Sequence, residues 1–435
     1  MRICSMKDIK AITGIMAASM LFAGCSSALK PSQTETPVKN DPQAKTAINL
    51  NEVSVTGYDS DLMDEEYRRY CFDLFSQTVK DYGGGDNIMI SPASIMMALD
   101  MVAAGAKGDS LRQLTDLFAE GQEPLTQQAY AAAVMDKING AKDVEFSCAN
   151  AVWNNETLLG DKVNLEYVDY IKKTYLAEYK VSPFGEKTPD EINSWIYDHT
   201  DHMIEKAIGE LDPMTAMVLV NAIAFDGQWA EPYKDTQVNE GDFRTSEGTM
   251  QNATFLSDTS SAYFETEKAT GFMKAYEGGE YAFLAILPQD ESISANDFAK
   301  EFTAEDYEAF INSVTYKYDV HSRIPEFKSD FGFVLNDTIK NLGAEDVFDK
   351  RTADLSGISG EPGDLYVSKV FHKTHIEVDR NGTKAAAVTV VSLDAAGCIE
   401  EVPEFKIVDC NRPFVYAIVD VETMTPVFAG TVNAV

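Results

Sequence analysis

The stretch Asn381–Thr389, which reads NGTKAAAVT, constrains the fold of this chain more than any other. If the segment is extended, its side chains alternate between two faces, and one face carries only small residues, namely Thr383, Ala385, Ala387 and Thr389. Gly382 adds a conformationally permissive residue in front, and the β-branched residues that follow favour an extended backbone. The pattern predicts a loop that can become a buried strand, although the alanines alone would equally suit a helix or an ordinary core strand.

The whole chain is long, apolar enough to build a large core, and strongly acidic. Its 435 residues are 45% hydrophobic and 10% aromatic, and 70 acidic against 36 basic residues give a formal charge of -34. Length alone would suggest two or three domains, but no interior segment has the composition of a linker. The negative charge argues against a nucleic-acid partner, because phosphates would be repelled, and it would attract a cationic partner. That the acidity serves only solubility is an equally open interpretation.

The N-terminus has the features of an export signal. Basic residues precede an apolar run from Ala11 to Ala23, which is too short for a permanent transmembrane helix. The run ends in the residues LFAGC, numbers 21–25, which resemble a bacterial lipoprotein signal cleaved before Cys25. We therefore expect residues 1–24 to be a lipoprotein signal peptide and Cys25 to be the lipidation site. A plain secretory signal is the alternative, and in both cases the protein leaves the cytoplasm.

A polar segment follows and precedes the first expected helix. Residues 26 to about 56 are rich in Ser, Thr, Gln, Asn and Lys, contain three prolines and show no apolar periodicity, as is typical of a tether. We therefore divide the chain into a signal peptide (1–24), a lipidated cysteine with a disordered tether (25–60) and one folded domain (61–435). We expect an extracytoplasmic lipoprotein that Cys25 anchors to the cell surface, with release from the surface as an alternative.

Helices dominate the first half of the folded part and strands dominate the second. From Leu62 onward apolar residues recur at helical spacing until Gly83-Gly84-Gly85 ends the helix, and residues 95–104 are apolar nearly all round, as in a buried helix. Four later stretches have the composition of strands, some of them apolar on both faces: 218–225, 281–288, 414–419 and 426–432. Because helices and strands do not alternate strictly, the sequence predicts an α+β fold.

The motifs of familiar enzyme classes are missing. The sequence contains no HExxH, no GxSxG, no GxxxxGK[ST] and no CxxC. Two of its five histidines, His372 and His375, lie in an expected strand with two residues between them, so their side chains face opposite ways and cannot readily share a metal. The cysteines outside the N-terminal signal and Cys25 are too few for a disulfide scaffold, and no motif supports a catalytic cysteine. We therefore expect a protein that is not an enzyme and that holds no metal and no cofactor.

Seven segments, in the same order as in the family, resemble the serpins, the serine protease inhibitors. They are residues 87–107 (NIMISPASIMMALDMVAAGAK), 219–229 (LVNAIAFDGQW), 281–288 (YAFLAILP), 323–327 (RIPEF), 342–348 (LGAEDVF), 368–389 with NGTKAAAVT, and 412–416 (RPFVY). The resemblance spans about residues 62–435. It implies a single domain with three β-sheets, eight to nine helices and a mobile reactive-centre loop.

The resemblance also implies a role for NGTKAAAVT. A serpin offers its loop as bait, a serine protease cleaves the loop and forms an acyl-enzyme, and the loop inserts into the main sheet before hydrolysis, which traps the enzyme. Before insertion, the folded serpin is not at its free-energy minimum, and a kinetic barrier keeps it from reaching that minimum. Serpin loop insertion is a well-known release of stored strain. Insertion of about 13 residues at ~3.4 Å each would move the loop end on the order of 45 Å. The implied hinge residues are Gly382, Thr383, Ala385, Ala386, Ala387 and Thr389.

The same resemblance indicates the bait. The family's spacing from Gly382 places the reactive bond between Ala396 and Gly397, with Ala395 or Cys398 as alternatives because the run to Pro413 is unusually long. An alanine before the bond suits an elastase-like pocket better than the acidic pocket of trypsin. We therefore expect a monomeric suicide inhibitor of elastase-like serine proteases, with cationic host enzymes as candidate partners. A noninhibitory serpin acting as a carrier or chaperone is the alternative, and a surface lipoprotein enzyme is the third.

Residues outside the loop also take on roles by position in the family. Trp229 corresponds to the breach, where insertion begins, although it would otherwise pass as an ordinary core residue. Four residues correspond to the shutter, the cluster over which the sheet opens: Ser91, Ser94, Asn221 and His372. Without the family, His372 would be read as a hydrogen-bonded core histidine.

The hinge departs from the family at two charged positions. Arg380 stands where an acidic residue is usual, and Lys384 stands where another glutamate is common. Both side chains would contribute little if they face solvent. The alternative is that they pair with acidic groups of this very acidic protein, and the sequence leaves the choice open.

Overall fold

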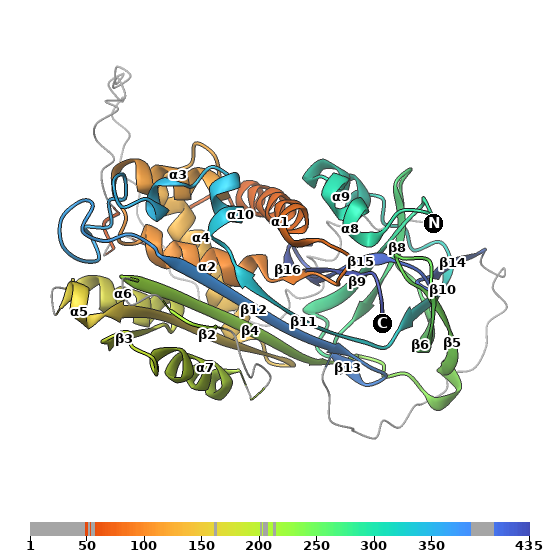
Figure 1. Cartoon of the computed structure of the whole chain (residues 1–435). Coiled ribbons are helices and arrows are strands. Elements are labelled where there is room, and N and C mark those ends of the chain that lie inside the picture. Colours follow the sequence, from red (N-terminus) through yellow and green to blue (C-terminus); the bar gives the residue numbers. More distant parts are fainter. Residues whose placement is uncertain are drawn as a thin grey trace, which may run out of the picture. The chain divides into compact units, whose positions relative to one another are not determined.

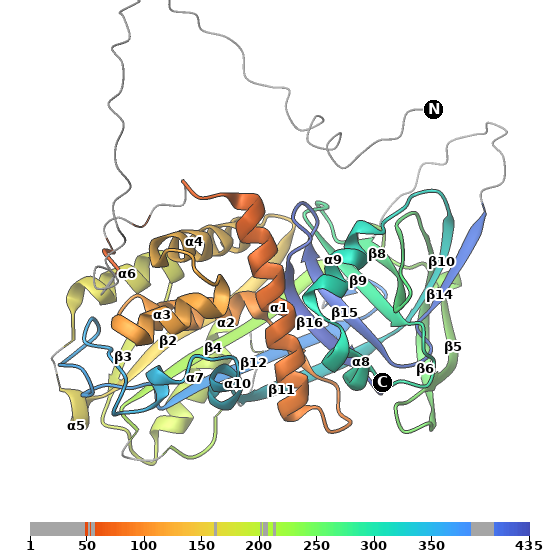
Figure 2. The same ribbon diagram turned by 90° about the horizontal axis from the view of Figure 1, so that it is seen from above.

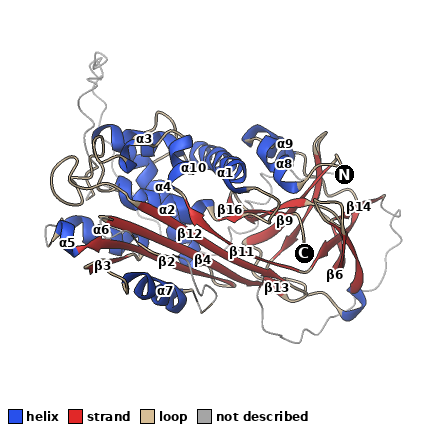
Figure 3. Ribbon diagram, in the orientation of Figure 1, coloured by secondary structure: helices blue, strands red, loops and turns tan. Residues whose placement is uncertain are grey.

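Ten α-helices and three β-sheets make up the part of the chain that the structure describes (Figures 1 and 3). This computed structural model describes residues 48–50, 53, 57–160, 163–200, 202, 208–211, 215–383 and 404–435. The chain divides into two units, 1–44 and 45–435, and all described residues belong to the second. The α+β class and the three sheets are as predicted.

The structure has more helices than the eight to nine that we expected. One source of the difference is α5 (Glu156–Leu159), a single turn that Asn155 caps through a 3.0 Å hydrogen bond from the Thr157 N–H and that ends at Gly160, where φ is 59°. Another is α10 (Asn336–Asn341), with six residues. Apolar periodicity needs several turns to be recognisable, so helices this short leave no clear pattern in the sequence.

The first long helices form where the sequence predicts them. α1 (Ser60–Tyr82) begins at Asp59, whose side chain accepts a hydrogen bond from the Leu62 N–H, and ends at Gly83. α2 (Pro92–Ala103) begins at Ser91, which caps the N–H of Ser94, and every residue of α2 is buried. Three further helices pack against α2: α3 (Gly108–Phe118), α4 (Pro124–Gly140) and α6 (Leu165–Tyr175). The predicted buried helix is therefore confirmed.

The main sheet has six strands in the order β11-β12-β13-β4-β2-β3. Its strands are β2 (Val144–Asn155), β3 (Glu178–Ser182), β4 (Met217–Gln228), β11 (Phe327–Val334), β12 (Lys369–Val378) and β13 (Gly382–Thr383). Figure 1 shows α2 on one face of this sheet and α7 (Thr188–His199) on the other. On β4, Leu219 and Ile223 join the large core, whereas Val218 and Val220 join a smaller core that includes Ile192 of α7. This strand is thus covered on both faces, as predicted.

The other two sheets lie mostly to the right of the main sheet in the views of Figures 1 and 2. The second, in the order β1-β16-β15-β9-β8-β7, comprises β1 (Met89–Ile90), β16 (Pro426–Val432), β15 (Phe414–Asp420), β9 (Tyr281–Pro288), β8 (Ala269–Ala275) and β7 (Tyr263–Glu265). The third, in the order β14-β10-β6-β5, comprises β14 (Phe405–Asp409), β10 (Asp319–Pro325), β6 (Met250–Ser260) and β5 (Val238–Arg244). The remaining helices are α8 (Ala295–Glu301) and α9 (Ala304–Asn312).

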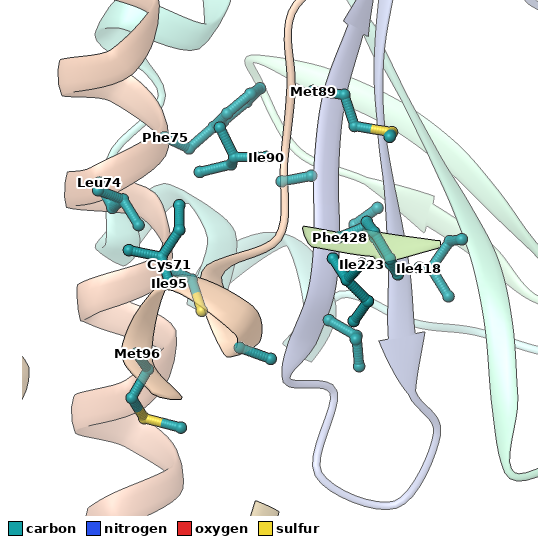
Figure 4. Packing of buried hydrophobic residues seen from close by; sticks show 14 of the residues in the cluster. Cys71, Leu74, Phe75, Met89, Ile90, Ile95, Met96, Ile223, Ile418 and Phe428 are labelled. Atoms are coloured by element: carbon teal, nitrogen blue, oxygen red, sulfur yellow. The ribbon is translucent and has the colours of Figure 1, made fainter. Parts of the chain in front are cut away.

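One apolar core joins the helices to two of the sheets. Figure 4 shows Leu74 and Phe75 of α1, Ile95 of α2, Ile223 of β4 and Phe428 of β16 within it. Burial of this much apolar surface supplies the main stabilising contribution to folding. Among the described residues, no helix combines the length and the hydropathy needed to cross a membrane.

Candidate functional site

The described part of the hinge lies at one end of the main sheet, between β4 and β12. Thr383 of β13 lies opposite Val378 of β12 and opposite Gly227 of β4, antiparallel to both. Further along the sheet, β12 and β4 pair with each other directly and in parallel, from 369 with 218 to 375 with 224. β13 therefore marks a point at which a strand enters a sheet whose two central strands are otherwise hydrogen-bonded together.

A tight turn positions the entering strand. The Asp379 side chain accepts hydrogen bonds from the N–H groups of Asn381 (2.6 Å) and Gly382 (3.1 Å), and the Asp379 N–H donates to the Gly382 carbonyl (2.9 Å). A Cβ on Gly382 would lie 2.2 Å from the carbonyl oxygen of Gly227. The sequence suggested a flexible pivot here, and the structure adds a steric reason, because only glycine allows the backbone to approach β4 this closely.

Trp229, directly after β4, is hydrogen-bonded to this turn. Its indole N–H donates to the carbonyl of Asp379 and its backbone N–H donates to the carbonyl of Asn381, both at 2.9 Å. The buried indole stacks on Tyr276, with ring centroids 4.6 Å apart and an interplanar angle of 11°. The Tyr276 hydroxyl in turn lies 2.7 Å from the Thr383 hydroxyl, and Thr383 is fully buried. Tyr276 thus connects Trp229 to Thr383 through one ring contact and one hydrogen bond.

The buried ammonium group of Lys274 lies next to Trp229 at the same end of the main sheet. The Lys274 ammonium lies 2.6 Å from Asp258, 4.3 Å from the centre of the Tyr233 ring and 5.8 Å from that of Trp229. Ion pairs and cation–π contacts of this kind are stronger when they are shielded from water. Tyr233 also donates its backbone N–H to the carbonyl of Arg380. Sequence reasoning did not find these residues, because they come from different elements and have no common motif.

The four residues assigned to the shutter form one buried hydrogen-bonded cluster between α2, β4 and β12. The Asn221 side-chain oxygen accepts from the Ser94 hydroxyl (2.7 Å) and from His372 Nδ1 (2.9 Å). His372 Nε2 accepts from the Ser91 N–H (3.1 Å), so His372 is the neutral tautomer with its proton on Nδ1. Burial lowers the pKa of His372 to about 3, and the imidazole therefore stays neutral at ordinary pH. His372 is thus hydrogen-bonded in the core at both ring nitrogens.

The cluster extends to β2 and β16, which the sequence did not connect with it. The Asn221 side-chain amide donates to Asn150 of β2 (2.8 Å), and Asn150 donates to the carbonyl of Tyr175 (3.3 Å). The Ser91 hydroxyl donates to the carbonyl of Val427 in the second sheet (2.8 Å). Because His372 lies on β12 and Asn221 on β4, a strand that entered between them would have to break the hydrogen bond between their side chains.

Arg380 pairs with acidic groups, which decides between the two interpretations of this position. Its guanidinium lies 3.1 Å from Asp235 and 3.9 Å from Glu326. Asp235 is 98% exposed and Arg380 is 42% exposed, so solvent screens the pairing strongly.

Replacement of Arg380 by alanine should lower the free energy of unfolding by less than about 1 kcal/mol. Arg380→Glu should be more damaging, because it places a third carboxylate beside Asp235 and Glu326. Chemical denaturation of the three proteins at low and high salt checks this order, and the difference between the two variants should shrink at high salt. A loss of several kcal/mol in the alanine variant would contradict the assignment of a screened pair.

Other predicted site residues fall outside the described residues. These are Cys25, Ala385, Ala386, Ala387, Thr389, Ala396 and Gly397. His372 is buried and His375 pairs with Asp330 on the opposite face of β12. In the part of the chain that the structure describes, no group of His, Cys, Asp and Glu side chains could hold a metal ion. The fold and the site define a single-chain α+β protein with a strand-entry point at the head of its main sheet.

Comparisons with known proteins agree with this description. A sequence model of the family described as Serpin (serine protease inhibitor) matches residues 65–435. An uncharacterized serpin-like protein of Methanosarcina mazei is 30% identical over 98% of both chains, and leukocyte elastase inhibitor A of Mus musculus is 31% identical over 83% of this chain and 97% of its own. The crystal structure of a thermophilic serpin, tengpin, in its native state is 32% identical, has a TM-score of 0.79, and covers 90% of this chain and 100% of that one. The chain belongs to the serpin family, whose members are in general protease inhibitors and not enzymes.

Proposed function

We propose that this protein is a suicide inhibitor that traps the acyl-enzyme of a serine protease by inserting its cleaved reactive loop between β4 and β12. The observation that carries the proposal is the position of β13, which already pairs with both strands at the entry point. A cleaved loop would extend β13 in the same direction. The direct pairing of β4 with β12 would then be replaced by two new antiparallel pairings, which is a net gain of backbone hydrogen bonds.

The register of β13 supports the assignment of the hinge face. Thr383 pairs with Gly227 and with Val378, and both pairings are antiparallel. Thr389 follows Thr383 by six residues, so its partners in the same register lie six residues earlier, at Asn221 and His372. An inserted loop in this register would place Thr389 level with the shutter cluster. Ala385 and Ala387 would share the face of Thr383, which is buried against Tyr276. Small side chains on this face can enter the core without displacing the side chains that are already packed there.

We propose an elastase-like protease as the target. Ala396 before the reactive bond, with Ala395 or Cys398 as alternatives, is a small side chain that fits an elastase-like pocket and does not complement an acidic one. The relation to a leukocyte elastase inhibitor agrees with this choice. A formal charge of -34 would also speed encounter with cationic host enzymes at low ionic strength.

We further propose that the protein acts outside the cytoplasm as a monomer tied to a membrane. Residues 1–24 would direct export, Cys25 would carry the lipid, and residues 25–60 would hold the serpin domain, 61–435, away from the surface. The motif at residues 21–25 supports this arrangement.

The direct test is to mix the purified serpin domain with pancreatic or neutrophil elastase and to separate the products by SDS gel electrophoresis. An inhibitor gives an SDS-resistant complex with the protease, because the two are joined by an acyl bond. Complete cleavage without complex would contradict the proposal and favour the carrier or chaperone alternative. Ala396→Arg should raise the rate of complex formation with trypsin by about tenfold or more, because arginine complements the acidic pocket. If complexes form only with elastase in that variant, the bond lies elsewhere.

A further inference from the structure

Asp100 is a buried carboxyl group in the middle of the apolar helix α2. It is fully buried, and one of its oxygens, Oδ2, accepts a hydrogen bond from the Tyr175 hydroxyl of α6. Its other oxygen, Oδ1, has no hydrogen-bond partner among the described residues, and neither has the side-chain amide of the buried Gln127 on α4. A buried polar group without a partner is costly, so a carboxyl group at this position needs an explanation.

Among the residues that the structure describes, no counter-charge accompanies this carboxyl group. The titratable groups that face it are Tyr70 of α1 and Tyr170 and Tyr175 of α6. α4 contributes neutral amides, and the amide of Gln128 donates to the Asp100 carbonyl (3.1 Å). α3, β4 and β16 also pack against α2 but present no charged side chain to Asp100. Burial raises the pKa of Asp100 to about 7, although the hydrogen bond from Tyr175 acts in the opposite direction.

Tyr175 connects this carboxyl group to the candidate functional site. Its hydroxyl binds Asp100, and its carbonyl accepts from Asn150, which in turn accepts from Asn221. β2, β3 and β4 are neighbours in the sheet and are hydrogen-bonded to one another. A strand that enters between β4 and β12 must shift this group of three strands, with Tyr175 attached to it, relative to α2. The contact between Asp100 and Tyr175 therefore joins α2 to the group of strands on the β4 side of the opening.

We propose that Asp100 is a pH-sensitive latch, which in its neutral form holds Tyr175 and the strands β2, β3 and β4 against α2 and keeps the sheet closed. Ionisation of Asp100 places an uncompensated charge in the core, and this charge favours an opened form in which water can reach the carboxylate. The inference rests on the proposed function for the direction of the sheet movement, but the latch acts in the free protein and is testable without a protease.

The direction of the pH effect follows from the two protonation states. The pKa of Asp100 in the native protein lies above that of an aspartic acid in the unfolded chain, so the native state binds the proton more tightly. Its contribution to stability is complete below the unfolded pKa of about 4, and is lost as pH rises toward and through 7. His372 acts in the opposite direction, because burial lowers its pKa to about 3, below that of an unfolded histidine, so its contribution to stability grows as pH rises through about 6.5. The effect of Asp100 is therefore measured against a variant that lacks only this carboxyl group.

The test is the lifetime of the native monomer during mild heating, followed on native gels at pH 5.5 and pH 8.5. The ratio of the wild-type lifetime to that of Asp100→Asn should be about tenfold lower at pH 8.5 than at pH 5.5, because the two pH values lie on either side of the pKa of Asp100 and each pKa unit corresponds to a tenfold change. Asp100→Asn cannot ionise and should lack this loss. Tyr175→Phe removes the hydroxyl that binds Asp100 and should be short-lived already at pH 5.5.

Asp64→Asn is the matched control. Asp64 is a part-buried carboxyl group on α1 that accepts from the Tyr130 hydroxyl at 2.8 Å, and burial raises its pKa as well. The ratio of the wild-type lifetime to that of Asp64→Asn should change less between the two pH values, because Asp64 is only part-buried. The latch is wrong if the ratio of the wild-type lifetime to that of Asp100→Asn is the same at pH 5.5 and pH 8.5. Elastase complexes are measured separately, so failure of inhibition with an intact pH effect would refute the proposed function and leave the latch standing.

Discussion

Replacement of Thr383 by arginine is expected to turn the inhibitor into a substrate and to lower the trapped fraction of protease by about 100-fold. Thr383 is fully buried between β4 and β12, and its hydroxyl lies 2.7 Å from that of Tyr276. An arginine does not fit this buried position and would stay outside the sheet in the uncleaved protein, so that insertion of the loop would require burial of its guanidinium, which costs several kcal/mol. Each 1.4 kcal/mol corresponds to a factor of ten. Insertion would then lose the race against hydrolysis of the acyl-enzyme.

The ratio of complex to cleaved inhibitor on an SDS gel measures this effect. Thr383→Val is the matched control, because it keeps the shape of the side chain, removes only the hydroxyl and should keep most of the trapping. Circular dichroism and the thermal midpoint show whether the uncleaved arginine variant is folded. Undiminished trapping by a folded arginine variant would show that Thr383 does not enter the sheet first.

The sequence predicts the elements of this fold well where hydrophobic periodicity is long. The strands expected at 281–288 and 426–432 have these bounds in β9 and β16, and the helix from Leu62 ends at Gly83 as expected. Such segments are buried on one or both faces over many residues, so the pattern is repeated often enough to be unambiguous. The short α5 has no repeat to recognise, and only its capping residue Asn155 gives any local signal.

The candidate site was predictable only in part, for a physical reason. Ser91 and His372 were named from the positions they hold in the family, and the structure brings them together with Asn221. Asn150 and Tyr276 were missed, because each acts through contacts with residues distant in sequence. Neither lies in a segment whose local pattern differs from that of an ordinary strand or strand end. Long-range hydrogen bonds of this kind become visible only when the sheet is assembled.

Replacement of Asn221 by alanine is expected to lower the free energy of unfolding by about 3–5 kcal/mol. The change leaves three buried groups without their partner: the Ser94 hydroxyl, the His372 Nδ1–H and the Asn150 side-chain oxygen. Each unsatisfied group costs about 1–3 kcal/mol. The loss should also shorten the lifetime of the native form, because the same hydrogen bonds connect β4 to α2 and, through His372, to β12.

Calorimetry and chemical denaturation at pH 7 measure the loss, and two variants separate it from general effects of asparagine removal. Asn252→Ala removes an exposed side chain on β6 that donates to Glu240, and should stay within about 0.5 kcal/mol of the wild type. Asn150→Ala removes one connection of Asn221 and leaves those to Ser94 and His372, so its loss should be intermediate. If Asn221→Ala proved no worse than Asn150→Ala, the bonds to Ser94 and His372 would not hold the sheet closed. The order wild type, Asn150→Ala, Asn221→Ala in falling lifetime ties stability to the hydrogen bond that an entering strand must break.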